Sequence, residues 1–138
     1  MVSVAVFDFD DTLLQSEQCK ADTIREIVSE YEGGLDALEG VPQDARSVPA
    51  GVIVSRHTIF REVASRLHAR GVRPGPEDEN AEAFGVRMCN RFTELVQRRL
   101  SQAAEVPGAT SMLEQLKREG VVCYINSATP EEPLARCR

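Results

Sequence analysis

Two aspartates near the start of the chain, Asp8 and Asp10, are separated by one residue and follow a short apolar segment. At the end of a strand this spacing lets both carboxylates leave the same side and approach each other closely. Their mutual repulsion is relieved by a divalent cation, and Mg²⁺ prefers carboxylate and carbonyl oxygens at sites open to phosphate. We therefore expect Asp8 and Asp10 to form a magnesium site that acts on phosphoryl groups.

Phosphoryl chemistry at such a pair needs a nucleophile and a proton carrier. A metal-bound Asp8 would stay ionised and attack phosphorus, whereas Asp10, with its side chain turned away from the metal, would protonate the departing oxygen. Ser127, after a second apolar segment, could hold phosphoryl oxygens together with backbone N–H groups of the Asp8 turn. We interpret the neighbouring Asp11 as a solubilising turn residue.

Two predicted strands, residues 2–7 and 121–125, must position these side chains. The first contains three valines and an aromatic residue, which fits a buried strand, and the second is apolar on both faces, as in a parallel strand covered on each side. If the strands are parallel, their C-terminal ends share the edge at which open α/β sheets place ligands. We therefore expect Asp8, Asp10 and Ser127 to converge there.

Between the strands the sequence predicts helices and no further strand. Residues 35–51 lack a sustained period and are predicted to be a loop with one short helical turn. Ser55 has the side chain and position of a helix N-cap. Apolar positions recur at helical spacing in four segments, residues 16–31, 55–69, 80–104 and 109–119. The order strand, helical block, helix, strand indicates an α/β crossover.

Composition narrows the possible partners. The chain has 138 residues, the length of one ordinary domain, and its net charge of -6 argues against binding nucleic acid or anionic lipid. No apolar run approaches the roughly 18 residues of a membrane span, and the opening residues do not resemble a secretory signal. The four cysteines are far apart and lack C-x-x-C spacing, which predicts reduced thiols. We therefore expect a cytoplasmic protein that binds neither nucleic acid nor a membrane.

The ends of both predicted strands resemble motifs of the haloacid dehalogenase (HAD) superfamily. Residues 4–13 are similar to its first motif, a hydrophobic strand followed by Asp-x-Asp-x-Thr-Leu, and residues 124–130 are similar to its second, a strand that ends in Ser or Thr. The approach to the second motif, Val-Pro-Gly-Ala at residues 106–109, resembles phosphoglycolate-phosphatase-like members. The helical insert is similar to the C1 cap of the family.

The resemblance implies a fold, a mechanism and a cofactor. The fold would be an α/β, HAD-like Rossmannoid parallel-sheet core, incomplete in this chain, with an inserted all-helical cap. Asp8 would be the nucleophile that forms an aspartyl-phosphate, Asp10 the general acid and base, and Ser127 a phosphate ligand. Mg²⁺ would be held by Asp8 and the carbonyl of Asp10, and the substrate would be a small phosphorylated metabolite. The core would comprise residues 1–14 and 104–138, and the cap residues 15–103.

The family pattern also includes a lysine after the second motif and an acidic strand end that completes the metal site. Both lysines of this chain, Lys20 and Lys117, precede Ser127, and eight residues follow Pro130. We therefore expect a Mg²⁺-dependent phosphatase that is incomplete as this chain, with poor hydrolysis by the chain in isolation. The alternative is a catalytically inactive, truncated HAD-like module with a binding or regulatory role. A second copy or a completing partner chain could supply the missing sheet edge.

Two other protein classes place paired acids at a strand end. A metal-dependent glycosyl transferase usually has a nucleotide-binding region first, and only seven residues precede Asp8. A phosphoacceptor receiver domain needs an acceptor aspartate after a middle strand and a later lysine, and the sequence shows neither. In the helical block we interpret His57, next to Arg56, as an exposed helical residue rather than a substrate contact.

Overall fold

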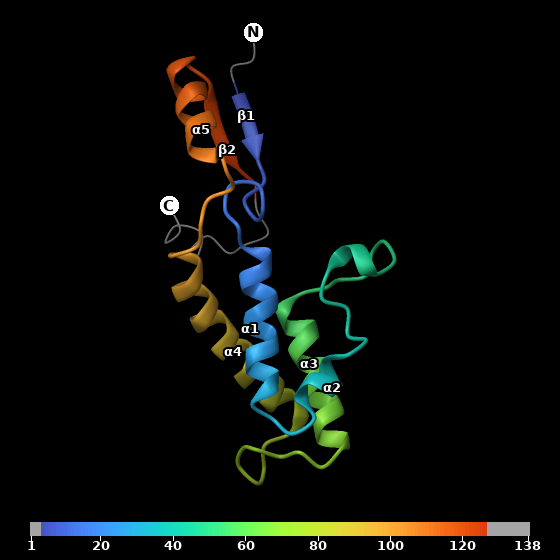
Figure 1. The fold of residues 1–138 in the computed structure, drawn as a ribbon. Helices are drawn as coiled ribbons and strands as arrows, with labels where there is room; N and C mark the ends of the chain where they lie inside the picture. Colours follow the sequence, from blue (N-terminus) through green and yellow to red (C-terminus); the bar gives the residue numbers. More distant parts are fainter. Residues whose placement is uncertain (1–3, 127–138) are drawn as a thin grey trace. The chain divides into compact units, whose positions relative to one another are not determined.

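The structure is a computed structural model in which residues 4–126 are described (Figure 1). These residues form two compact units, residues 4–20 with 96–126 and residues 21–95. The predicted α/β class is confirmed. The elements run in the order β1 (Val4–Phe7), α1 (Glu17–Ser29), α2 (Gly34–Leu38), a 3-10 helix η1 (Ala45–Ser47), α3 (Arg56–Ala69), α4 (Ala81–Leu100), α5 (Ala109–Arg118) and β2 (Val122–Ile125).

The first unit contains a parallel pair of strands, β1 and β2. Its register places Val4 beside Val122 and Phe7 beside Ile125. The N–H of Asn126 donates to the carbonyl of Phe7 at 2.8 Å, so the pairing continues to the last residue of β1. The C-terminal ends of both strands therefore lie at the same edge, as the crossover architecture predicts.

The prediction that both strands are buried is wrong for one face of this sheet. Residues paired in register point to the same face, and the face that carries Val6 and Tyr124 leaves these side chains 63% and 58% exposed. Helix α5 packs against β2 (Figure 1). Parallel strands are buried on both faces only where helices cover both faces. Within the described part of the chain, the face of Val6 and Tyr124 stays open.

Helix α3 begins where the sequence predicts. The Ser55 side chain accepts the N–H of Thr58 at 3.3 Å, and the Ser55 N–H donates to the Thr58 hydroxyl at 2.9 Å. This reciprocal pair satisfies two N–H groups at the start of the helix. The predicted N-cap role of Ser55 is therefore confirmed.

The segment 35–51 contains more structure than predicted, because it includes most of α2 and all of η1. Gly34 lets α2 start close to the end of α1, since a Cβ at this position would lie 1.7 Å from the carbonyl oxygen of Val28. Asp44 caps η1 by accepting the Arg46 N–H at 2.8 Å, and the hydrogen bonds from Arg46 lower the pKa of the Asp44 carboxyl. Such short helices depend on single local contacts and leave no hydrophobic period in the sequence.

The core of the second unit is built from aromatic and aliphatic side chains of α1, α3 and α4. The Phe84 ring packs edge-on against Tyr31, with 5.0 Å between ring centroids, and is stacked with His68 at 5.6 Å. Phe60 packs against Phe92 at 5.5 Å. The side chains with less than 2% exposure in this unit include Ile27, Val28, Phe60, Val63, Leu67, Phe84 and Met88.

Helix α4 carries ion pairs on its solvent side. Arg87 pairs with Glu79 at 2.9 Å, and this hydrogen bond lowers the pKa of the Glu79 carboxyl. Arg91 pairs with Glu30. Two arginines of this helix are thus paired with acidic residues. No helix within residues 4–126 combines the length and apolar character needed to cross a membrane.

Candidate active site

Asp8 is the first residue after β1 and lies at the edge where both strands end. Its side chain is exposed. Among the residues that the structure describes, this carboxylate forms no hydrogen bond or ion pair. It is therefore accessible to a phosphate ester or a cation, as a nucleophile must be.

A tight turn follows Asp8 and determines where the next aspartates lie. The carbonyl of Phe9, a buried residue, accepts the N–H groups of Leu13 at 3.0 Å and of Thr12 and Leu14 at 3.3 Å. The turn is held to the segment before α5, because the Val106 N–H donates to the Leu13 carbonyl at 3.1 Å. Asp10 thus sits in a backbone loop that is tied to the rest of its unit. Thr12 is a turn residue.

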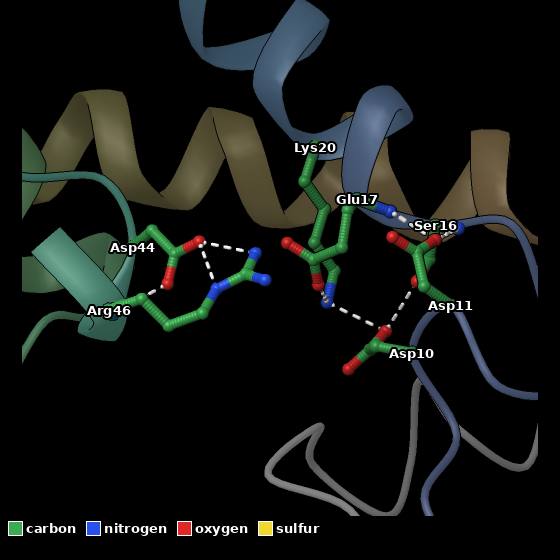
Figure 2. Close-up of polar contacts among 7 residues, drawn as sticks. All are labelled: Asp10, Asp11, Ser16, Glu17, Lys20, Asp44 and Arg46. Carbon is green, nitrogen blue, oxygen red and sulfur yellow. Dashed lines mark hydrogen bonds and ion pairs between the residues drawn. The ribbon is translucent and has the colours of Figure 1, made fainter.

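The carboxylate of Asp10 is bound by the beginning of α1 (Figure 2). Its Oδ1 atom lies 2.8 Å from the ammonium group of Lys20 and accepts the Ser16 hydroxyl at 2.7 Å. The Asp10 and Lys20 side chains are only 16% and 20% exposed, and Ser16 is fully buried. Charge-assisted hydrogen bonds of this kind are short and stronger than neutral ones.

Sequence reasoning missed Ser16 and Lys20 as part of this site. Their spacing of four residues, one turn of helix directly after the aspartate motif, is a signal that could have identified them. The signal is weak because most such pairs on a helix lie on a solvated face. The bond to Asp10 depends on the turn at residues 9–14, whose path the sequence alone does not show.

Asp11 is a turn residue, as predicted, but its carboxylate also has a structural role. Its Oδ1 atom accepts the N–H of Ser16 at 3.0 Å and that of Glu17 at 3.2 Å, which are orphan donors at the start of α1 (Figure 2). Its backbone has φ 55°, in the left-handed region that Asp and Asn tolerate better than other side chains. The interpretation of Asp11 as merely solubilising is therefore wrong.

Replacing Asp11 with alanine should lower the free energy of unfolding by about 1–2 kcal/mol, because the helix loses its cap. The left-handed backbone adds to this loss, since alanine pays a steric penalty there. Asn keeps both an oxygen acceptor and tolerance of this conformation, so Asp11→Asn is the matched control and should lose much less. Urea unfolding followed by circular dichroism measures both variants. Equal losses in the two would contradict the capping role.

The proposed cation site has oxygen donors of the right chemistry. The exposed carboxylate of Asp8 and the oxygens of Asp10 are the hard ligands that Mg²⁺ prefers, and such sites commonly keep several waters. Within residues 4–126, no three His, Cys, Asp or Glu side chains come together as a metal site. Ser127 lies outside the described residues, so its phosphate role stays a prediction. The described part of the chain thus brings together Asp8, Asp10 and their supporting residues.

In the helical unit, Arg56 and His57 contact α4. Arg56 donates to the Thr93 hydroxyl at 3.0 Å and lies over the Phe92 ring, and the Nδ1 atom of His57 is 3.4 Å from the Cys89 sulfur. Burial raises the pKa of the Cys89 thiol, and Arg56 opposes this effect only in part. A thiol held in its protonated form is a poor nucleophile, so this pair is structural. His57 is exposed, as predicted.

Comparison with protein families identifies a match over nearly the whole chain. The family model described as haloacid dehalogenase-like hydrolase matches residues 2–138. A search of curated proteins finds no match. The matched range includes β1, the turn with Asp8 and Asp10, the helical unit and β2.

Proposed function

The chain belongs to the haloacid dehalogenase-like hydrolase family, and on that premise we propose that it is a Mg²⁺-dependent phosphatase that works through an aspartyl-phosphate on Asp8. The observation that carries the proposal is the contrast between the two aspartates. Asp8 is exposed at the edge where β1 and β2 end, whereas Asp10 is held by Lys20 and Ser16. One carboxylate is thus accessible for attack, and the other is fixed in place for proton transfer.

The reaction divides into two displacements. First, an oxygen of Asp8 bonds to phosphorus while the ester P–O bond breaks, and Asp10 gives a proton to the departing oxygen. A water molecule then attacks the phosphorus of the aspartyl-phosphate, Asp10 takes its proton, and phosphate leaves as Asp8 is regenerated. Mg²⁺, held by Asp8 and the carbonyl of Asp10, would neutralise charge on the phosphoryl oxygens. Ser127 and backbone N–H groups would hold these oxygens.

The substrate in this proposal is a small phosphorylated metabolite. Residues 15–103, which contain the helical unit 21–95, would act as the cap that selects the leaving group, as the family resemblance implies. The net charge of -6 favours local recognition of phosphate at the Asp8 edge over a broadly basic surface. Nucleic acid and membranes are not among the proposed partners.

Phosphate release by protein isolated from its own cells tests the proposal. The assay uses p-nitrophenyl phosphate as substrate, either with added Mg²⁺ or with excess EDTA. We expect turnover with Mg²⁺ and loss of turnover when the cation is chelated, since the oxygen ligands need a hard cation to neutralise phosphate charge. Ca²⁺ is the matched control, because its larger and more flexible coordination sphere supports attack less well. Turnover that is equal with Mg²⁺ and with EDTA would contradict the proposal.

A second candidate function is binding without turnover, by a HAD-like module that lacks catalysis. The ion pair of Asp10 with Lys20 is compatible with this function, because it would also serve as a structural link between the turn and α1. In that case a phosphate monoester would raise the melting temperature of the protein while no phosphate is released. The release assay and a thermal shift on the same sample separate the two functions.

A further inference from the structure

Two donors from the start of α1 meet on one oxygen of Asp10. Lys20 Nζ lies 2.8 Å from Oδ1, and the Ser16 hydroxyl donates to the same atom at 2.7 Å (Figure 2). The Lys20 N–H also donates to the Ser16 carbonyl at 3.0 Å, so the two side chains belong to one helical turn. The orientation of the Asp10 carboxylate is therefore set by the first turn of α1.

This turn is itself anchored. The neighbouring Asp11 carboxylate accepts two of its N–H groups, and the Gln15 N–H donates to the Ala104 carbonyl at 2.9 Å. Ser16 is fully buried, which prevents its hydroxyl from exchanging Asp10 for water. Donors on a fixed and largely buried turn can hold a carboxylate more closely than donors on a mobile loop.

Lys20 is directed mainly at Asp10. Its other acidic neighbour, Glu17, is 3.9 Å away, beyond hydrogen-bonding distance. Three aspartates lie within residues 8–11, and of the two lysines in the chain Lys20 is the one bound to this cluster. Lys20 binds the second aspartate of the motif, Asp10, whereas the first, Asp8, stays exposed.

We propose that Lys20 and Ser16 are positioning residues that hold the Asp10 carboxylate where it exchanges a proton with the leaving group. This inference rests on the proposed phosphatase function. The inference predicts an effect that depends on the leaving group of the ester. Loss of Lys20 slows the first displacement of esters whose leaving group must be protonated, and hardly affects that step for esters whose leaving group departs as a stable anion.

The test measures hydrolysis of an alkyl phosphate and of p-nitrophenyl phosphate by protein isolated from its own cells, without a substitution and as the Lys20→Met variant. Methionine keeps much of the length of the side chain and removes its charge and donors. We expect kcat/KM for the alkyl ester, which reports the first displacement alone, to fall about 10- to 100-fold, because misplacement of a catalytic group by about 1 Å has effects of this size. The value for the aryl ester should change less than about threefold, since p-nitrophenolate leaves without a proton.

Three further variants make the result specific. Lys20→Arg restores a cation and should recover most of the alkyl activity, whereas Ser16→Ala should shift the alkyl-to-aryl ratio in the same direction as Lys20→Met. Lys117→Met, at the other lysine of the chain, is the matched control and should leave the ratio unchanged. Ser16→Ala also provides a second probe if Lys20→Met does not fold.

The outcomes separate this inference from the proposed function. An equal fall for both esters in Lys20→Met, or an Arg variant no better than the Met variant, would overturn the positioning role while the phosphatase function stands. Failure of the unsubstituted protein to hydrolyse either ester would overturn the proposed function, and the positioning role with it. A selective fall for the alkyl ester with recovery in Lys20→Arg would support both.

Discussion

Replacing Asp8 with asparagine should lower phosphate release by about a thousandfold or more, because the amide cannot attack phosphorus to form an acyl phosphate. The substitution changes one oxygen to nitrogen and removes a charge without changing the shape of the side chain. Asp8 is exposed and forms no hydrogen bond or ion pair within the described residues. The free energy of unfolding should therefore stay close to that of the unsubstituted protein, and the loss would report chemistry alone.

Asp11→Asn is the matched control for Asp8→Asn. It makes the same chemical change three residues later, at a side chain that caps α1 and that we assign no catalytic role. Its turnover should stay within about threefold of the unsubstituted protein, since Asn is nearly as good a cap as Asp. Steady-state phosphate release measures both variants, and circular dichroism confirms that both are folded. Unchanged turnover in Asp8→Asn would exclude Asp8 as the nucleophile.

Replacing Phe84 with alanine should produce the largest loss of stability, about 3–5 kcal/mol, as for other buried aromatic side chains. Phe84 is fully buried, and its ring contacts Tyr31 after α1 and His68 in α3. The guanidinium group of Arg87 also lies 5.2 Å from the ring centroid. Alanine would leave a cavity where these contacts meet, and the surrounding helices could close it only in part.

Val86→Ala provides the control for Phe84→Ala on the same helix. Val86 is 54% exposed, so its truncation should change the free energy of unfolding by less than about 0.5 kcal/mol. Urea unfolding of the full chain, followed by circular dichroism, gives the unfolding midpoints of the unsubstituted protein, Phe84→Ala and Val86→Ala. A midpoint of Phe84→Ala equal to that of Val86→Ala would show that the contacts of the Phe84 ring do not stabilise the helical unit.

The long helices could be predicted from the sequence because their apolar stripes are periodic over several turns. Helix α3 begins after Ser55 as predicted, and the predicted segment 80–104 contains α4 at Ala81–Leu100. Each turn of such a helix repeats the same pattern, so the signal accumulates with length. Helix α2 has five residues and η1 three, and neither is long enough to show a period.

The candidate site also has a part that could be predicted from the sequence and a part that could not. Asp8 and Asp10 could be selected as candidates because a strand followed by Asp-x-Asp is a local pattern. Whether Asp8, Asp10 and Ser127 carry the assigned roles stays a prediction, as does the need for a second copy or a completing partner. The partners of Asp10 and the capping by Asp11 became visible only in the folded turn.

By itself, the sequence determined the α/β class, the order of the elements and the family of this protein, because these depend on hydrophobic periods and short motifs that neighbouring residues specify. The tertiary structure decided which side chains the aspartates bind and which sheet face stays open in the described part of the chain. The open face depends on the pairing of segments far apart in the chain, such as Val6 with Tyr124, and the partners of the aspartates depend on a turn that is held by the distant contact of Leu13 with Val106. Such contacts form when the chain packs, and the spacing of residues along the sequence does not specify them.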